Sequence, residues 1–166
     1  MILRFFLLAG FLVAGNSHAK GPFAGEVSFV SDGDTLWVQP DAGGPPRKLR
    51  IDGIDAPEIC QTGGVASREV LAQHALHKRV SVSVRQYDSY GRGLAHIQLG
   101  DDDLGAQMVR AGQAWSYRWR RNPGPYAAEE AVARQSRRGL VATNDPPELP
   151  RSFRQRHGPC HAVRLR

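Results

Sequence analysis

The pattern of apolar and polar positions predicts five short β-strands. Apolar residues at every second position are typical of a strand with one buried face. The alternation is strictest at 79–86, where Val80, Val82 and Val84 point to one side. Similar runs are separated by turns rich in Gly, Pro or Asp. They predict strands at 26–31, 35–39, 48–54, 79–86 and 94–99.

The same alternation predicts which side chains face the core. In the first strand, Val27 and Phe29 share the apolar face. In the third strand, Leu49 faces the core, while Arg50 and Ile54 lie on the opposite face.

Apolar positions three and four residues apart predict three helices, at 65–76, 104–111 and 125–138. Asp103 is interpreted as the N-cap of the second helix rather than as part of a metal loop, because 101–103 lacks the EF-hand spacing. A helix between the third and fourth of five strands matches the order of an OB-fold. The predicted fold is therefore α+β, a five-stranded OB-fold β-barrel with three helices.

Composition divides the chain into three parts. Residues 1–19 contain Arg4, an apolar run and a small-residue site ending at Ala19, which predicts a cleaved signal peptide, with an uncleaved anchor as the alternative. The folded domain is expected at 20–144, followed by a basic tail rich in Pro and Arg at 145–166. We therefore expect an exported protein, periplasmic or extracellular, without stable membrane insertion after cleavage.

The mature chain is basic and is expected to bind a polyanion. The formal charge of +6 becomes +5 if cleavage removes Arg4 with no acid. A basic surface suits nucleic acid or an anionic surface, and charge alone does not choose between them. The arginine-rich tail is interpreted as a solvated, disordered end.

The chain has two cysteines, Cys60 and Cys160. In an oxidising compartment an even count suggests one disulfide, which would tie the tail to the loop after Glu58. Two free thiols are the alternative, and zinc-site spacing is absent from the sequence.

Two carboxylates and an arginine converge in the segment 49–58. Asp55 and Glu58 flank a rigid proline, and Arg50 precedes them on the same strand. Asp34, in an Asp-Gly-Asp-Thr turn, offers a second hard oxygen ligand for Ca²⁺ or, less well, Mg²⁺. Arginines match phosphate oxygens with two parallel hydrogen bonds, and Arg92 in a Tyr-Gly-Arg-Gly turn offers a second such fork.

These residues also have purely structural interpretations. Asp32 and Asp34 could form an ordinary hairpin turn, Arg50 a surface ion pair, and Arg92 a solvated turn residue. Asp32 lies two residues before Asp34, so it is either a partner of the metal through water or a plain turn residue.

The four segments together resemble the staphylococcal nuclease (thermonuclease) family, from about Glu26 to Leu140. The resemblance implies that Arg50, Glu58 and Arg92 are catalytic, with Glu58 as base and the arginines on the phosphate. It implies metal ligands at Asp34, Asp55 and the backbone carbonyl of Ala56.

The resemblance further implies Ca²⁺ as cofactor, and hydrolysis of DNA and RNA that expels the 5′-oxygen to leave a 3′-phosphate. Single strands or frayed duplexes are the favoured substrates, and we expect a monomer. A non-catalytic nucleic-acid-binding module and a protein that binds anionic polymers are the alternatives.

Exposed aromatic residues could stack on bases. Tyr90 resembles the tyrosine that the family has beside the nucleotide, although Ser89 stands where the family often has lysine. Tyr117 and Trp119 are assigned to nucleic-acid binding on a weaker match, whereas Trp115 is expected to pack between the barrel and the last helix.

Overall fold

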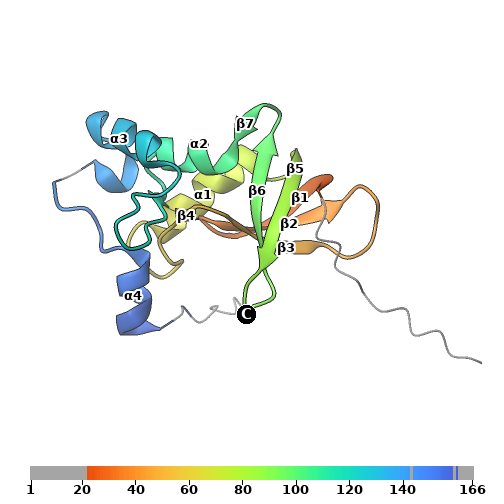
Figure 1. The fold of residues 1–166 in the computed structure, drawn as a ribbon, viewed down its shortest axis with the longest axis horizontal. Coiled ribbons are helices and arrows are strands. Elements are labelled where there is room, and N and C mark those ends of the chain that lie inside the picture. Colours follow the sequence, from red (N-terminus) through yellow and green to blue (C-terminus); the bar gives the residue numbers. More distant parts are fainter. Residues whose placement is uncertain (1–21, 143, 159, 161–166) are drawn as a thin grey trace, which may run out of the picture.

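The computed structural model describes residues 22–142, 144–158 and 160. The predicted signal peptide at 1–19 lies outside these residues. Figure 1 shows a strongly curved sheet with helices gathered at one end. The long strands are β1 (Phe23–Asp32), β2 (Thr35–Pro40), β3 (Arg47–Ile51), β5 (Arg79–Tyr87) and β6 (Gly93–Leu99).

The five long strands close into the predicted barrel. The sheet order is β3-β2-β1-β5-β6, and β3 also pairs with β6, in parallel. Closure places Leu49 beside Gly93 and Ile51 beside Ala95. The OB-fold prediction is confirmed. The remaining strands are short: β4 (Ile54–Asp55), β7 (Asp102–Asp103) and β8 (Trp115–Ser116).

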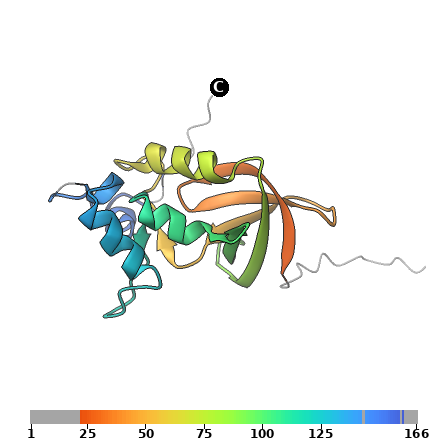
Figure 2. The ribbon, with the colours of Figure 1, turned by 90° about the horizontal axis from the view of Figure 1, so that it is seen from above.

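The barrel interior is filled by the predicted alternating side chains. Val80, Val82 and Val84 of β5 are all buried. Each aliphatic side chain removed from water in this way contributes about 1.5–3 kcal/mol of transfer free energy. Helix α1 (Gly64–Ala75) packs against β1 (Figure 2). It buries Leu71 and Ala75 completely.

Two strands differ from prediction in which residues they bury. The β1–β2 register shifts between Val27 and Phe29, so Phe29 is 57% exposed and Val30 is buried in its place. The third strand ends at Ile51 rather than continuing to Ile54. Gly53 turns the chain with φ +80°, and Ile54 is buried in β4 instead of facing away from the core.

The structure has a fourth α-helix in addition to the three predicted. Asp103 caps α2 (Leu104–Arg110) as predicted, because its carboxylate accepts a hydrogen bond from Ala106 N–H at 2.9 Å. The third is α3 (Ala127–Gln135), followed by a short 3₁₀ helix, η1 (Gly139–Val141). The additional helix is α4 (Pro150–His157).

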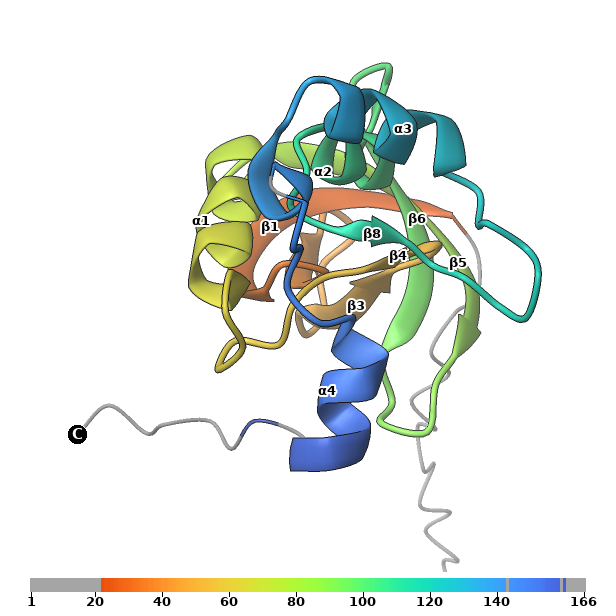
Figure 3. The same cartoon turned by 90° about the vertical axis from the view of Figure 1, so that its left-hand side faces the viewer.

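The prediction of a disordered tail is therefore wrong for α4, which lies against the side of the barrel that carries β4 (Figure 3). None of the helices in the described part of the chain is long and apolar enough to cross a membrane.

Candidate active site

The first carboxylate of the site is fixed by the turn between β1 and β2. Asp34 is 4% exposed, and its backbone N–H donates a hydrogen bond to Asp32 Oδ1 at 3.1 Å. Gly33 packs so closely on α1 that an added Cβ would overlap the side chain of Ser67. The Asp-Gly-Asp turn is thus a closely packed joint between barrel and helix, which holds the Asp34 carboxylate in one place.

Arg50 joins this carboxylate to a second one. Its Nη1 donates to Asp34 Oδ2, and its Nη2 donates to Asp55 Oδ1 at 2.9 Å and to the Ile54 carbonyl at 3.2 Å. Asp55 is only 6% exposed. Pairing of Arg50 with Thr35 across β2 and β3 sets the position of the guanidinium. Two buried carboxylates therefore share one arginine.

The short sheet of β4 and β8 positions Asp55. Asp55 pairs with Trp115, and Ile54 pairs with Ser116. The turn before β4 is secured by Asp52, whose Oδ1 accepts the Gly53 N–H at 3.0 Å.

The three aspartates have shifted pKa values because they are buried close together. Burial, and next the charge of Asp34, raise the pKa of Asp32 to about 7. Burial and the charge of Asp34 also raise the pKa of Asp55, against the opposing effect of Arg50. Burial alone would raise the pKa of Asp34, but Arg50 and several hydrogen bonds outweigh it and lower that pKa. Negative charge is thus crowded at the site, and Arg50 offsets part of it.

Arg92 lies at the entrance of β6 and is held by its own turn. Its Nε donates to Asp88 Oδ2 at 2.8 Å, and its backbone N–H donates to Asp88 Oδ1 at 2.9 Å. Its Nη1 lies 3.4 Å from the hydroxyl of Thr35, which in turn donates to Asp34 Oδ1 at 3.0 Å. Tyr90 is 79% exposed, with the Arg92 guanidinium 5.4 Å from its ring centre. Thr35 thus links the second arginine to the first carboxylate.

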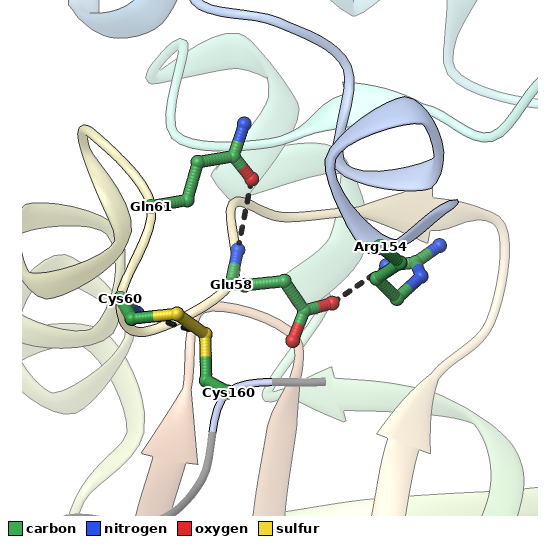
Figure 4. Close-up of a disulfide and its surroundings, with 5 residues drawn as sticks. All are labelled: Glu58, Cys60, Gln61, Arg154 and Cys160. Atoms are coloured by element: carbon green, nitrogen blue, oxygen red, sulfur yellow. Dashed lines mark hydrogen bonds and ion pairs between the residues drawn. A yellow bond between two sulfur atoms is a disulfide. The ribbon is translucent and has the colours of Figure 1, made fainter. Parts of the chain in front are cut away.

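Glu58 meets an arginine that the sequence did not assign to the site. Arg154 of α4 donates from Nη1 to Glu58 Oε1 at 2.7 Å (Figure 4). The same nitrogen donates to Asp55 Oδ1 at 3.2 Å. The loop that carries Glu58 is closed by a hydrogen bond from Glu58 N–H to Gln61 Oε1 at 3.2 Å. A disulfide joins the adjacent Cys60 to Cys160 across 100 residues of sequence.

The structure thus brings together every polar residue assigned to the site. Arg50 bridges Asp34 and Asp55, Arg154 bridges Asp55 and Glu58, and Arg92 reaches the group through Thr35. The backbone N–H of Ala56 donates to Asp34 Oδ2 at 3.2 Å, so Ala56 also adjoins the group. Their chemical roles stay predictions.

Tyr117 and Trp119 line a neighbouring cleft. They are 38% and 54% exposed, and the cleft of about 830 Å³ also includes Arg85 and Tyr126. The Arg151 guanidinium of α4 lies 5.3 Å from the centre of the Trp119 ring. Trp115, by contrast, is 2% exposed and packs as predicted, in a cluster with Ala133, Leu140 and Val141.

Three members of the group had no role assigned from the sequence: Thr35, Asp88 and Arg154. Asp88 could have been found from its position four residues before Arg92, a spacing that suits a carboxylate and an arginine in one turn. Arg154 had only an indirect signal, the second cysteine six residues later.

The donor set fits a hard cation. Among the residues that the structure describes, no cluster of three or more His, Cys, Asp and Glu side chains has the spacing of a metal site. Asp34 and Asp55 are the two carboxylates that a cation here would bind, with backbone and solvent oxygens completing its shell. The negative charge of Asp34 already raises the pKa of Asp55 after burial, so a bound cation would relieve that repulsion.

Comparisons with known proteins show similarity to proteins named as nucleases and endonucleases. A family model described as "Staphylococcal nuclease homologue" matches residues 48–142. A Haemophilus influenzae protein named "Uncharacterized endonuclease" is 33% identical over 119 residues, 72% of this chain and 66% of that protein. An Escherichia coli O157:H7 protein of the same name is 35% identical over 123 residues, 74% of this chain and 79% of that protein.

A Shigella flexneri protein named "Micrococcal nuclease" is 33% identical over 137 residues, 77% of this chain and 78% of that protein. The matches thus span about two thirds to four fifths of the length of these relatives.

Proposed function

This chain belongs to the staphylococcal nuclease family, and we propose that it is an exported, Ca²⁺-dependent phosphodiesterase. As a thermonuclease-like nuclease it hydrolyses DNA and RNA with little sequence specificity. The observation that carries the proposal is the Arg50 guanidinium shared by the buried carboxylates of Asp34 and Asp55. A barrel core gains nothing from this arrangement, because burying charged groups costs more than burying apolar side chains of equal size.

The proposed cation site uses the carboxylates of Asp34 and Asp55 and the Ala56 carbonyl. Ca²⁺ prefers oxygen ligands and accepts irregular geometry, which suits one carboxylate from a turn and another from a separate strand. When bound there, it supplies a Lewis acid that polarises the phosphate.

The remaining groups bind, orient and exchange protons. Arg50 and Arg92 bind the non-bridging phosphate oxygens and stabilise the charge that builds up on them in the transition state. Glu58 orients a water molecule and accepts its proton. The new bond joins the water oxygen to phosphorus, and the bond to the 5′-oxygen breaks with its electron pair. The 5′-oxygen then takes up a proton, which leaves a 5′-hydroxyl and a 3′-phosphate.

Low sequence specificity follows from the kind of contacts available. The exposed ring of Tyr90 adjoins Arg92, and Tyr117 and Trp119 line the nearby cleft. Stacking on aromatic rings tolerates every base, and it requires bases that have left the duplex. We therefore expect single strands and frayed duplex ends to be cleaved faster than intact duplex.

The proposal that the protein acts outside the cytoplasm has its main support in the sequence of residues 1–19. The disulfide between Cys60 and Cys160 also suits an oxidising compartment. Cell fractionation of the full-length chain tests this part separately, and retention of uncleaved protein in the cytoplasm would contradict it.

A cleavage assay tests the activity. Residues 20–166 are incubated with single- and double-stranded DNA and RNA in Ca²⁺, in Mg²⁺ or in chelator. We expect cleavage in Ca²⁺ that chelator abolishes, and fragments whose 5′ ends accept phosphate from a polynucleotide kinase without prior phosphatase treatment.

The same Glu→Gln substitution at two positions tests the role of Glu58 in this assay. Glu58→Gln should reduce the rate by about 10²–10⁴-fold, whereas Glu69→Gln, at an exposed position on α1, should leave it unchanged. Equal rates for the two variants would remove Glu58 from the mechanism. Nucleic-acid binding without cleavage in any metal would favour a non-catalytic binding module instead.

A further inference from the structure

Helix α4 reaches the centre of the site although it lies outside the matched family region, which ends at residue 142. Its Arg154 forms ion pairs with Asp55 and Glu58, the proposed metal ligand and base. The guanidinium uses both terminal nitrogens, since Nη2 also lies 3.3 Å from Asp55 Oδ1. Its side chain is 34% exposed, so Arg154 lines the open side of the group.

The position of α4 depends on tethers rather than on a core. In this polar helix only Pro150 is buried. An isolated helix of eight residues would be marginal in water. The disulfide to Cys60, the stacking of Arg151 on Trp119 and a hydrogen bond from Gln61 Nε2 to the Glu148 carbonyl hold the segment in place. Each of these contacts fixes α4 beside the site, and Figure 4 shows the disulfide and Arg154 on the two sides of Glu58.

Arg154 stands in the same relation to the carboxylates as Arg50. Each guanidinium bridges two of them: Arg50 joins Asp34 to Asp55, and Arg154 joins Asp55 to Glu58. Arg50 is assigned to phosphate binding although it pairs with two proposed metal ligands. The ion pair of Arg154 with Asp55 therefore does not imply that Arg154 blocks the site. When a phosphate is present, both forks can turn from carboxylate to phosphate oxygens, which have similar spacing.

The net charge of the bridged groups also favours phosphate binding by Arg154. Three carboxylates and two guanidiniums give a net charge of minus one, and a divalent cation changes it to plus one. That value matches the single negative charge of a phosphodiester. Without Arg154, these bridged groups and the cation would together be neutral, and their attraction for the substrate would weaken.

We propose that Arg154 is a third phosphate-binding arginine, which α4 and the Cys60–Cys160 disulfide deliver to the carboxylates of Asp55 and Glu58. This inference rests on the proposed nuclease function. In it, Arg154 binds a non-bridging oxygen of the scissile phosphate on the side where Glu58 holds the attacking water. The disulfide acts by keeping α4 at a high local concentration beside the site.

The proposal predicts opposite effects on metal and substrate. Removing a positive charge next to Asp55 and Glu58 strengthens Ca²⁺ binding, since the cation no longer competes with a guanidinium. It weakens substrate binding and catalysis, because one phosphate contact is lost. A merely structural role of Arg154 would not give effects of opposite sign.

The test compares Arg154→Gln with Arg156→Gln, a control on the same helix whose side chain is 65% exposed and pairs with Glu148. For Arg154→Gln we expect calorimetry with Ca²⁺ alone to show binding tighter by on the order of tenfold. We expect kcat/KM for single-stranded DNA to fall by on the order of 10²-fold. Binding of a cleavage-resistant phosphorothioate oligonucleotide in Ca²⁺ should weaken in parallel. The control should change none of the three.

The conservative variant separates charge from shape. Arg154→Lys keeps the charge but lacks the planar fork, so Ca²⁺ affinity should stay near wild type while kcat/KM falls by less than in Arg154→Gln. With both cysteines replaced by serine, Arg154→Gln should have a smaller effect on kcat/KM, because α4 is then beside the site for less of the time.

Three outcomes would overturn the inference. If Ca²⁺ affinity and kcat/KM both rise in Arg154→Gln, the residue blocks the site. If both fall, its role is structural, and if neither changes, it forms a surface ion pair only. Failure of wild-type protein to cleave in any metal would instead refute the proposed function, which keeps the two failures distinct.

Discussion

Glu130 is a buried carboxylate, and its removal should destabilise β4, the strand that carries Asp55. It lies on α3 and is 3% exposed. Its Oε2 accepts the backbone N–H of Ser116 in β8 at 3.0 Å. Its Oε1 accepts from the guanidinium of Arg118 and, at 2.7 Å, from that of Arg134. Since β8 is paired only to β4 within the described sheet, Glu130 secures the two-stranded sheet on which Asp55 lies.

The loss in free energy of unfolding expected for Glu130→Ala can be divided among these contacts. Glu130→Ala leaves the buried Ser116 N–H without its acceptor, which costs about 1–3 kcal/mol. The two arginine side chains are 41% and 45% exposed, so each lost pair adds only about 0.5 kcal/mol. The free energy of unfolding should therefore fall by about 2–4 kcal/mol in total. Glu130→Gln keeps an acceptor for Ser116 and should cost about 1 kcal/mol.

Urea denaturation followed by tryptophan fluorescence measures both variants, and the cleavage assay is run at low temperature, where both remain folded. We expect Glu130→Ala to lose more activity than Glu130→Gln, because Asp55 moves with β4. Glu129→Gln is the matched control, since the ion pair that Glu129 makes with Arg110 is long, at 3.5 Å. If Ala and Gln at position 130 destabilise equally, the bond to Ser116 N–H is not the main contribution.

Three further predictions concern stability. Because burial raises the pKa of Asp32 to about 7 from 3.8, the stabilisation from its proton is complete below pH 4 and is lost as the pH rises through about 7. Asp32→Asn should therefore raise the free energy of unfolding by roughly 2–4 kcal/mol at pH 8 in chelator but not at pH 3, and equal effects at both pH values would contradict this. Replacing Cys60 and Cys160 by serine should lower the free energy of unfolding by at most about 4–5 kcal/mol relative to oxidised wild type in urea denaturation. Reduced wild type should behave like the variant, and a variant as stable as oxidised wild type would mean that the disulfide does not constrain the chain. Gly53→Ala should cost about 1–3 kcal/mol by thermal denaturation, because φ is +80° and a Cβ would lie 2.6 Å from a proline side chain; Gly43→Ala, with φ +83° in open space, should cost less.

The fold could be predicted wherever local alternation and burial coincide. The run of Val80, Val82 and Val84 specifies one buried face, and Asp103 specifies a helix start, because both signals depend on near neighbours. The predicted burial of Phe29 was wrong because the β1–β2 register shifts before it. Such a β-bulge inserts one residue and reverses the faces of the residues that follow. The predicted orientation of Ile54 was wrong because its strand, β4, pairs with β8, some sixty residues later in the chain. No local sequence pattern indicates such a distant partner.

The site was predictable to the extent that its chemistry is carried by short turns. Asp34, Arg50 and Asp55 stand at turns and strand ends, where a charged side chain has no role in an apolar core. Arg154 could not be assigned, because the tail around it has a composition typical of disordered segments. Its place depends on a disulfide and on ion pairs that connect residues about a hundred positions apart.

Asp55 and Glu58 are positioned mainly by groups outside the barrel. Strand β4 has only two residues, and a pairing that short contributes too few hydrogen bonds to hold a charged group in place by itself. From one side, Glu130 of α3 secures β8 and thereby β4. From the other side, α4 brings Arg154 to the same two carboxylates. The spacing of these carboxylates therefore depends on contacts of α3 and α4 as well as on the closed sheet of the barrel.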